Sequence, residues 1–182
     1  MILPQEFYKR RPDSVARELL GKKIVRVIGG EIISGYVIET EAYFGPEDPA
    51  SRARKGGDLA EVMRGDQGVA LVYGVHKQWL LNIVAHEDGE AGAVLIRSIL
   101  SDEPILGPGR VTKFLRVDKS FHRVPVFIES SQLRIEEGFE VADEQVVRSY
   151  RVGVREDLEE PLNFSLSTLR RSRRTVSEKA GS

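Results

Sequence analysis

The sequence predicts one domain of the α+β class, with β-hairpins as its main units and few helices. Three observations support this class. Apolar and β-branched runs recur between short glycine-containing turns. Helical periodicity is confined to two short stretches. The chain of 182 residues is long enough to bury a core, and it shows no internal repeat and no linker that would divide it.

The chain opens with a predicted helix and a predicted hairpin. Residues 13–20 have a capping residue at their start and an apolar side, and Gly21 ends the helix. Residues 24–28 and 31–43 are predicted as two strands joined by a Gly-Gly turn. Gly35 is expected to mark a bulge in the second strand.

The rest of the chain alternates between apolar runs and polar connections. Residues 47–67 are polar and rich in Gly and Arg, and they are predicted to form a long functional or disordered loop. A short helix with a basic side is expected over 110–117. Further strands are expected over 69–73, 79–85, 91–100, 124–130, 132–135 and 145–154. The folded domain is predicted to span 1–169, followed by a basic, flexible tail at 170–182.

The composition excludes several classes of site. The absence of cysteine excludes disulfides, thiolate zinc sites and a Cys nucleophile, and it fits an intracellular chain. The three histidines lack tight ligand spacing, so no metal or other cofactor is expected. No apolar run approaches the roughly 20 residues of a membrane helix, and the N-terminus lacks the order of a secretory signal. We therefore expect a protein of the cytoplasm or nucleoid with no membrane partner.

Charge is segregated along the chain, although the formal net charge is only −1. A net charge near zero argues against a strongly cationic nucleic-acid binder. The basic clusters lie at 9–11, 52–55, 110–123 and 170–174, and the acidic ones lie at 136–144 and 156–160. Such runs are usually solvated patches, but a neutral protein can also present one basic face to a polyanion.

The stretch 37–46 is the strongest candidate for a functional site. It reads Val-Ile-Glu-Thr-Glu-Ala-Tyr-Phe-Gly-Pro. Strand periodicity places Glu39, Glu41 and Tyr43 on one face, with Ile38 and the two intervening residues on the other. One interpretation is a pocket floor, with a carboxylate to move a proton and a ring to stack on a flat group. The other is an ordinary edge strand with its charges in water.

Absent motifs narrow the chemistry further. No Gly-x-Ser-x-Gly elbow, P-loop or dinucleotide fingerprint occurs. The turn at 107–109 precedes the basic helix, so its free backbone N–H groups can hold a phosphate. The best catalytic candidate is a carboxylate acting on water, either Glu39 or Glu41, with Arg97 as a charge partner.

Several blocks of the sequence, in order, resemble one enzyme family. The most specific block is Glu-Thr-Glu-Ala-Tyr-Phe-Gly-Pro, within residues 38–51. The other blocks lie at 15–22, 81–84, 94–97, 107–121, 151–154 and 161–164. On these residues the chain resembles the alkyladenine (3-methyladenine) DNA glycosylases of the mammalian AAG type, which remove damaged purines. The resemblance covers nearly the whole chain.

The resemblance implies a fold and an activity. The implied fold is a curved antiparallel sheet with surrounding helices, shared with the C-terminal domain of methionyl-tRNA formyltransferase. The implied activity is base excision repair by a glycosylase without a metal, acting as a monomer on double-stranded DNA that contains damaged purines. Because no Lys lies in the motif to form a Schiff base, a monofunctional, water-using reaction is implied.

Four residues match positions with roles in the family. Glu41 resembles the general base that deprotonates the attacking water, and Arg97 resembles the residue that helps to hold that water. Tyr43 resembles the aromatic wall on which the flipped purine stacks. Asn82 resembles the side chain that disfavours normal guanine by crowding its exocyclic amine. Without the resemblance, a hydrogen-bonding residue at a strand end is the simpler interpretation of Asn82.

The chain departs from the family pattern at two places. Arg52 stands where the family usually has a histidine that lines the base pocket. Its cation either disfavours positively charged 3-alkyl purines or turns outward to a phosphate. The loop at 57–68 is several residues shorter than usual, so some of the family's DNA contacts are not expected here.

The hairpin that carries the family's stacking and wedge tyrosines aligns in two ways. One alignment makes Tyr73 the wedge that fills the gap left by the flipped nucleotide. The other uses the distance from Asn82, and it makes Tyr73 the second stacking wall with His76 at the tip. The second is preferred because the strands determine hairpin register. In both, the tip with His76 and Lys77 is expected to enter the DNA. The expected backbone contacts are Gly109, Arg110, Lys113 and Lys119.

Two other functions stay open. A lesion- or nucleic-acid-binding protein on the same scaffold, with little turnover, predicts tight, salt-dependent binding to damaged duplex without base release. An RNA-binding scaffold predicts affinity for tRNA and has no use for Glu41.

Overall fold

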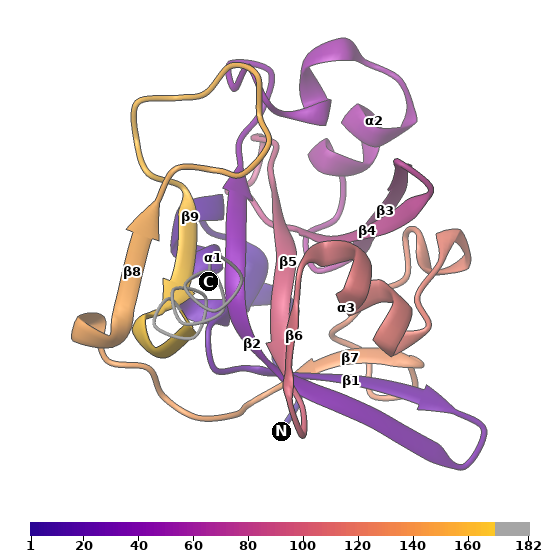
Figure 1. The fold of residues 1–182 in the computed structure, drawn as a ribbon. Helices are drawn as coiled ribbons and strands as arrows, with labels where there is room; N and C mark the ends of the chain where they lie inside the picture. The colour runs from indigo at the N-terminus through magenta and orange to yellow at the C-terminus, as the bar shows by residue number, and fades with distance from the viewer. Residues whose placement is uncertain (170–182) are drawn as a thin grey trace.

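The computed structural model describes residues 1–169 and confirms an α+β domain with a curled antiparallel sheet (Figure 1). The sheet has nine strands, and all its neighbouring strands pair antiparallel. Helices lie around the sheet. The tail predicted at 170–182 lies outside the described residues.

The elements have the following bounds. The strands are β1 (Lys23–Ile28), β2 (Glu31–Tyr43), β3 (Ala70–Val75), β4 (Gln78–Val84), β5 (Ala93–Leu100), β6 (Pro104–Leu106), β7 (Leu133–Glu136), β8 (Val146–Ser149) and β9 (Asn163–Leu166). The α-helices are α1 (Pro12–Leu19), α2 (Asp58–Arg64) and α3 (Pro108–Leu115). Short 3₁₀ turns are η1 (Gln5–Tyr8), η2 (Arg52–Lys55), η3 (Lys119–Phe121) and η4 (Asp143–Gln145).

Strand β2 organises the sheet. The strand order is β3-β4-β5-β2-β1-β7, with β6 beside β5, β9 beside β2 and β8 beside β9. Strand β2 is 13 residues long. Its first half pairs with β1, and its second half lies between β5 and β9. The second half is therefore hydrogen-bonded on both edges.

The predicted opening helix and hairpin are present, and a glycine is required where α1 ends. Gly21 has φ +85°, and a Cβ there would lie 2.3 Å from the carbonyl oxygen of Phe139. The bulge expected at Gly35 is wrong, because Gly35 pairs in regular register with Ile24. The register shift lies further along, between Val37 and Thr40.

This shift changes which side chains face the same way. Val37 is opposite Ile99, whereas Thr40 is opposite Ile96. Both isoleucines belong to the larger of the two apolar clusters of the domain, so their side chains point to the same face of the sheet. Arg97 and Ser98, which lie between them on β5, therefore both point to the other face. On β2, Ile38 lies inside the register shift and has no direct partner on β5. Its side chain therefore does not follow the strict alternation of faces that was expected for it. The irregularity therefore adds polar side chains to the face that carries Glu39.

Two apolar clusters cover the two faces of the sheet. Helices α1 and α3 supply residues to the larger cluster, while α2 and η2 supply residues to the smaller one. On β3, Ala70 and Val72 belong to the larger cluster and Leu71 to the smaller. On β5, Val94 belongs to the larger and Ala93 to the smaller. This alternation shows that the clusters lie on opposite faces.

Several predicted elements differ from the structure. The loop expected over 47–67 contains η2 and α2, and α2 has Asp58 and Glu61 in its first turn, a helix-start signal. No strand forms over 124–130; instead this segment runs along the edge of β3 through backbone hydrogen bonds. The strand expected over 145–154 ends at Ser149. Strands β6 and β9 were not predicted. Within residues 1–169, no helix has the length and apolar character needed to cross a membrane.

Candidate active site

Strand register brings Glu41 and Asn82 to one face of the sheet. Leu95 on β5 is opposite Glu41 on one side and Asn82 on the other. On the far side of β2, Asn163 is opposite Glu41. Directly opposed residues point to the same face, so all four side chains share it. Two strand spacings separate Glu41 from Asn82, which is about 10 Å.

The carboxylate of Glu41 is buried, with 0% of the residue exposed. Its Oε1 accepts a hydrogen bond of 2.9 Å from the Tyr43 hydroxyl. Its Oε2 accepts 2.8 Å from the backbone N–H of Val152 and 3.0 Å from Nδ2 of Asn163. Donors from two strands and a loop therefore fix the position of the carboxylate. A carboxylate has about four acceptor positions, so Oε1 keeps room for another donor.

Arg97 lies beside Glu39 and Glu41. Its Nη1 is 3.8 Å from Oε1 of Glu41, and its Nε is 3.5 Å from Oε2 of Glu39. Asn163 Nδ2 also donates to Oε2 of Glu39, at 3.0 Å, and Ser98 donates to Oε1 of Glu39 at 2.7 Å. Glu39 and Glu41 are therefore both buried and share an arginine and an asparagine. The solvated edge strand, one of the two interpretations of this stretch, is excluded.

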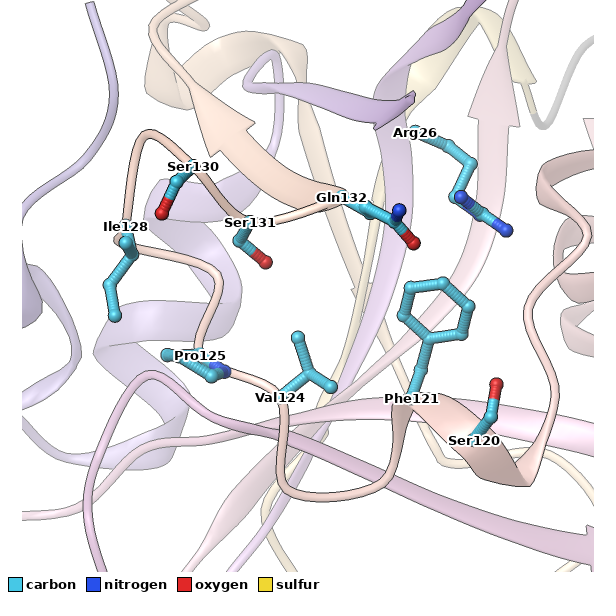
Figure 2. Close-up of a pocket in the computed structure, with 9 residues that line it drawn as sticks. All are labelled: Arg26, Ser120, Phe121, Val124, Pro125, Ile128, Ser130, Ser131 and Gln132. Atoms are coloured by element: carbon cyan, nitrogen blue, oxygen red, sulfur yellow. The ribbon is translucent and has the colours of Figure 1, made fainter. Parts of the chain in front are cut away.

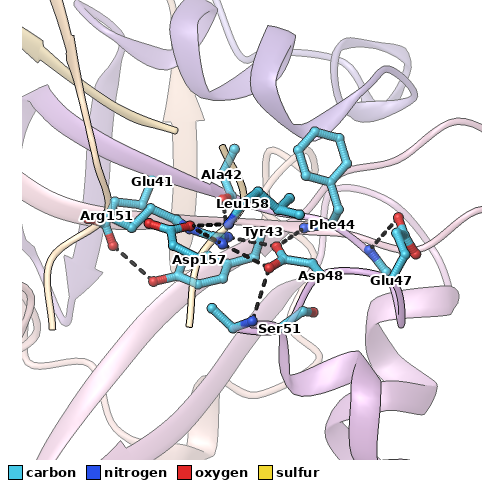
Figure 3. Close-up of polar contacts among 12 residues, drawn as sticks. Glu41, Ala42, Tyr43, Phe44, Glu47, Asp48, Ser51, Arg151, Asp157 and Leu158 are labelled. Carbon is cyan, nitrogen blue, oxygen red and sulfur yellow. Dashed lines mark hydrogen bonds and ion pairs between the residues drawn. The ribbon is translucent and has the colours of Figure 1, made fainter. Parts of the chain in front are cut away.

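A buried arginine packs against the ring of Tyr43 (Figure 3). The guanidinium of Arg151 is 4.6 Å from the ring centroid of Tyr43. It donates to Asp48 through Nη1 at 2.6 Å and Nη2 at 2.8 Å. Asp157 accepts from its Nε at 2.9 Å and its Nη2 at 2.6 Å, and the carbonyl of Ala42 accepts at 3.1 Å. The loop between β8 and β9 is thus attached to the end of β2.

Burial and these contacts shift the pKa values of Tyr43 and Asp48. Burial raises the pKa of Tyr43 above its ordinary value of 10.0, and the Glu41 carboxylate raises it further. Tyr43 therefore stays a hydrogen-bond donor at any ordinary pH. Burial alone would raise the pKa of Asp48, but hydrogen bonds from Arg151 and two backbone N–H groups bring it below its ordinary value.

The other predicted base-pocket residues lie near Tyr43. Tyr43 and Tyr73 both pack against the smaller cluster. The guanidinium of Arg52, in η2, lies 4.9 Å from the ring centroid of Tyr73. Asn82 is 2% exposed, and its Nδ2 donates to the carbonyl of Leu71 at 3.2 Å. These four predicted residues therefore lie on, or pack against, the face that carries Glu41.

The β3–β4 hairpin turns at His76 and Lys77. Both residues are exposed and have positive φ, +51° and +63°, as a tight two-residue turn requires. Tyr73 lies further back on β3 and is partly buried. The tip of the hairpin is therefore formed by His76 and Lys77 rather than by Tyr73.

The predicted backbone-contact residues divide into two places. Lys77, Gly109, Arg110 and Lys113 border a pocket of about 520 Å³ between the hairpin and α3. A Cβ at Gly109 would lie 2.2 Å from Oε1 of Gln78, so glycine there permits this close approach. The remaining predicted residue, Lys119, lies in η3 and is exposed.

A second pocket, of about 550 Å³, opens between β1 and the segment 120–132 (Figure 2). The guanidinium of Arg26 lies 4.4 Å from the ring centroid of Phe121 along one side of it. Glu41 and Tyr43 line neither this pocket nor the one beside α3. Within residues 1–169, no group of three or more His, Cys, Asp or Glu side chains could hold a metal ion.

Arg151 and Asn163 belong to the site, although neither is among the site residues predicted from the sequence. The apolar Tyr150 and Val152 suggested a continuing strand, yet they are 64% and 53% exposed while Arg151 is 5% exposed. A buried charge is stable only with partners, and both partners of Arg151 are distant or loop residues. No local pattern could have indicated this pairing. Asn163 lies in β9, a strand that the sequence did not predict.

Comparison with known proteins gives consistent matches over the chain. Residues 6–105 and 101–170 match the family described as methylpurine-DNA glycosylase (MPG). A protein of Aeropyrum pernix assigned as a 3-methyladenine DNA glycosylase is 49% identical over 174 residues, covering 91% of this chain and 90% of the relative. Similarly assigned proteins of Salinibacter ruber and Myxococcus xanthus are 35% and 38% identical. The match to the Salinibacter ruber protein covers 86% of this chain and 89% of the relative. The match to the Myxococcus xanthus protein covers 84% of this chain and 81% of the relative.

Proposed function

Because this chain belongs to the methylpurine-DNA glycosylase family, we propose that it excises alkylated or deaminated purines from double-stranded DNA. The bond that breaks joins C1′ of the deoxyribose to N9 of the purine. A water oxygen forms the new bond to C1′, and the purine leaves with the bonding electron pair. The products are a free base and an abasic site, so the enzyme is a monofunctional hydrolase of N-glycosyl bonds.

Glu41 is proposed to accept the proton of the attacking water. The observation that carries this role is the set of hydrogen bonds that holds the buried carboxylate in one position, from Tyr43, Val152 and Asn163. Arg97 lies at the same oxygen, Oε1, and is proposed to help hold the water. A positioned carboxylate base typically contributes about 10²–10⁴-fold to the rate.

The damaged purine is proposed to leave the duplex and stack between Tyr43 and Tyr73. A base inside a helix cannot present its glycosidic bond to a buried carboxylate, so flipping is required. Asn82, about 10 Å across the sheet from Glu41, is proposed to reject the exocyclic amine of normal guanine. Tyr43 and Arg97 keep some exposed surface beside the buried Glu41, which supports access from this side.

The hairpin tip and α3 are proposed to contact the DNA itself. His76 and Lys77 would enter the gap left by the flipped nucleotide, because they form the exposed end of the hairpin. Arg110 and Lys113, exposed on α3, would bind backbone phosphates.

The test is base release from duplex oligonucleotides that carry 3-methyladenine, 7-methylguanine, hypoxanthine or ethenoadenine. Wild type should release at least one of these bases, and Glu41→Gln should lose at least about 10²-fold in single-turnover rate. Glu39→Gln is the matched control, since Glu39 shares Arg97 and Asn163 with Glu41. The single-turnover rate should fall less in Glu39→Gln than in Glu41→Gln.

Two outcomes would contradict the proposal. Full activity of Glu41→Gln would remove the catalytic assignment. Tight, salt-dependent binding of damaged duplex by wild type, without release of any base, would support a lesion-binding protein instead.

A further inference from the structure

We propose that Arg151 is a positioning residue that sets the orientation of both Glu41 and Tyr43. This inference rests on the proposed function, because it assigns Arg151 a task in that reaction. Arg151 is separated from Glu41 by more than 100 residues in sequence, and it acts through its neighbours rather than on the substrate. Two separate connections, one through the backbone and one through the side chain, lead from it to the site.

The backbone connection runs through the next residue. The side chain of Arg151 is held by Asp48, Asp157 and the carbonyl of Ala42. The peptide N–H that follows it, that of Val152, donates to Glu41 Oε2 at 2.8 Å. Only the backbone torsions of Arg151 lie between its held side chain and the N–H of Val152. The contacts that hold the Arg151 side chain therefore also restrain the position of this N–H.

The neighbouring side chains supply little of this restraint. Tyr150 and Val152 are 64% and 53% exposed, so neither is anchored by burial in a core. The strand that leads into the segment, β8, already ends at Ser149. Arg151, 5% exposed, is the buried residue of this three-residue segment and the one with charged partners.

The side-chain connection runs through the ring of Tyr43. The guanidinium lies 4.6 Å from the ring centroid, a distance at which a cation is attracted to the π-face. With one face of the ring held in this way, its hydroxyl points to Glu41 Oε1 at 2.9 Å. The opposite face is then available for stacking with a purine.

The energetics of the cluster favour a positioning task over a stabilising one. Arg151 and Asp48 form an ion pair with both side chains 0% exposed. Moving such charges out of water costs about as much as their attraction returns, and apolar residues of similar volume often stabilise a fold equally well. Placing this costly pair beside the proposed base is explained if it holds the base and the ring in their reactive geometry.

The experiment compares Arg151→Lys with wild type in the single-turnover rate of base release and in the affinity for lesion-containing DNA. Lysine keeps the charge but loses the planar fork that binds Asp48 and Asp157 together. A misplacement of about 1 Å is enough to lower a rate by about 10²-fold, and we expect a loss of that order. The dissociation constant for lesion-containing DNA should change less than threefold.

A second variant tests the backbone connection without disturbing the buried ions. Val152→Pro removes the N–H that donates to Glu41 while the Arg151 side chain keeps its partners. It should show a rate loss of at least about tenfold, with the dissociation constant for lesion-containing DNA again changed less than threefold. Arg155→Lys, an identical exchange at an exposed position of the same loop, is the control and should match wild type. If Arg151→Lys does not fold, as judged by circular dichroism, Val152→Pro decides.

The outcomes separate this inference from the proposed function. Wild type that releases bases, together with folded variants of unchanged rate, would overturn the positioning role and leave the proposed function intact. A loss of rate accompanied by an equal loss of affinity for lesion-containing DNA would also overturn it, since general destabilisation explains that result. Wild type that releases no base would overturn both.

Discussion

The hydroxyl of Tyr43 donates a hydrogen bond of 2.9 Å to Oε1 of Glu41, two residues earlier in the same strand. The pair lies on the same face of β2 because side chains repeat every second residue along a strand. The residue proposed to stack on the purine is thereby linked to the residue proposed to activate the water. A substitution of Tyr43 is therefore expected to change the position of the Glu41 carboxylate, and a substitution of Glu41 that of the Tyr43 ring.

Tyr43→Phe should separate these two tasks. The phenylalanine ring keeps the stacking surface, but Glu41 loses one of its donors. We expect single-turnover base release to fall by about tenfold, as for the loss of about 1.4 kcal/mol of transition-state stabilisation. The dissociation constant for lesion DNA should stay near that of wild type. Tyr43→Leu, which also removes the ring, should weaken DNA binding, and equal binding by the two variants would contradict the stacking role.

Asp48→Asn should reveal a pH-dependent contribution to stability. The folded-state pKa of Asp48 is below its ordinary value of 3.8, so the native state binds fewer protons there than the unfolded state. The stability that ionised Asp48 contributes to the folded state is therefore fully present above about pH 4, and it is lost as the pH falls through the lowered pKa. Breaking a buried pair costs about 3–5 kcal/mol, so urea unfolding at pH 7 should show a loss of this order.

The pH series provides the check on Asp48. The difference between wild type and Asp48→Asn should narrow as the pH is lowered beneath 3.8. If the difference in unfolding free energy stays constant down to the pH at which wild type unfolds, a group other than Asp48 is responsible for the pH dependence. Asp13→Asn, whose ion pair with Arg11 is partly exposed, is the matched control and should change stability by about 1 kcal/mol or less.

Arg52→His should change the choice between lesions. The guanidinium of Arg52 lies over Tyr73, so a purine stacked there approaches a fixed positive charge. Purines alkylated at N3 or N7 carry a positive charge in DNA, whereas hypoxanthine and ethenoadenine are neutral. Because Arg52 is exposed, the repulsion is about 1 kcal/mol, which corresponds to roughly fivefold.

The measurement for Arg52 is the ratio of rates for 7-methylguanine and hypoxanthine in matched duplexes. The ratio should rise about fivefold in Arg52→His. Arg54→His is the control, because Arg54 lies in the same turn but is directed to Glu156 at 3.8 Å. An unchanged ratio in Arg52→His would show that Arg52 turns away from the bound base, towards a phosphate.

His76→Gly should identify the wedge. Glycine accepts the positive φ of this position without strain, so only the side chain is lost. If His76 fills the gap, base release from a matched duplex should fall by about tenfold, equal to about 1.4 kcal/mol. Release from a mismatched site, where unstacking is cheaper, should fall less. Tyr73→Leu should impair both substrates alike; a defect confined to the matched duplex would make Tyr73 the wedge.

Arg110→Gln and Lys113→Gln should each reduce the salt dependence of DNA binding. Each phosphate contact contributes about −0.9 to the slope of log K against log salt concentration. Each substitution should therefore make the slope shallower by about 1. Titrations by fluorescence anisotropy at several salt concentrations would measure this. Arg134→Gln, on β7 and directed to Glu136 at 3.8 Å, should leave the slope unchanged, and an equal effect there would point to a diffuse charge effect.

Local sequence patterns were enough to predict the elements whose signals lie within a few residues. The first helix and its glycine stop, the Gly-Gly hairpin and the second hairpin all follow from capping, turn and alternation rules. The alternation of β2 also placed Glu39, Glu41 and Tyr43 together. Predictions failed where a segment obtains its conformation from distant partners, as at 124–130, which follows the edge of β3.

The sequence by itself determined a strand with Glu39, Glu41 and Tyr43 on one face, and through the resemblance it determined the family. Only the tertiary structure decided that both carboxylates are buried, that Asn163 lies between them, and that Arg151 turns inward while Tyr150 turns out. The physical reason is that periodicity reports the cost of exposing apolar groups along one element. The burial of a charge depends instead on partners such as Asp48, which lies 103 residues from Arg151 in sequence, and chain folding alone brings those together.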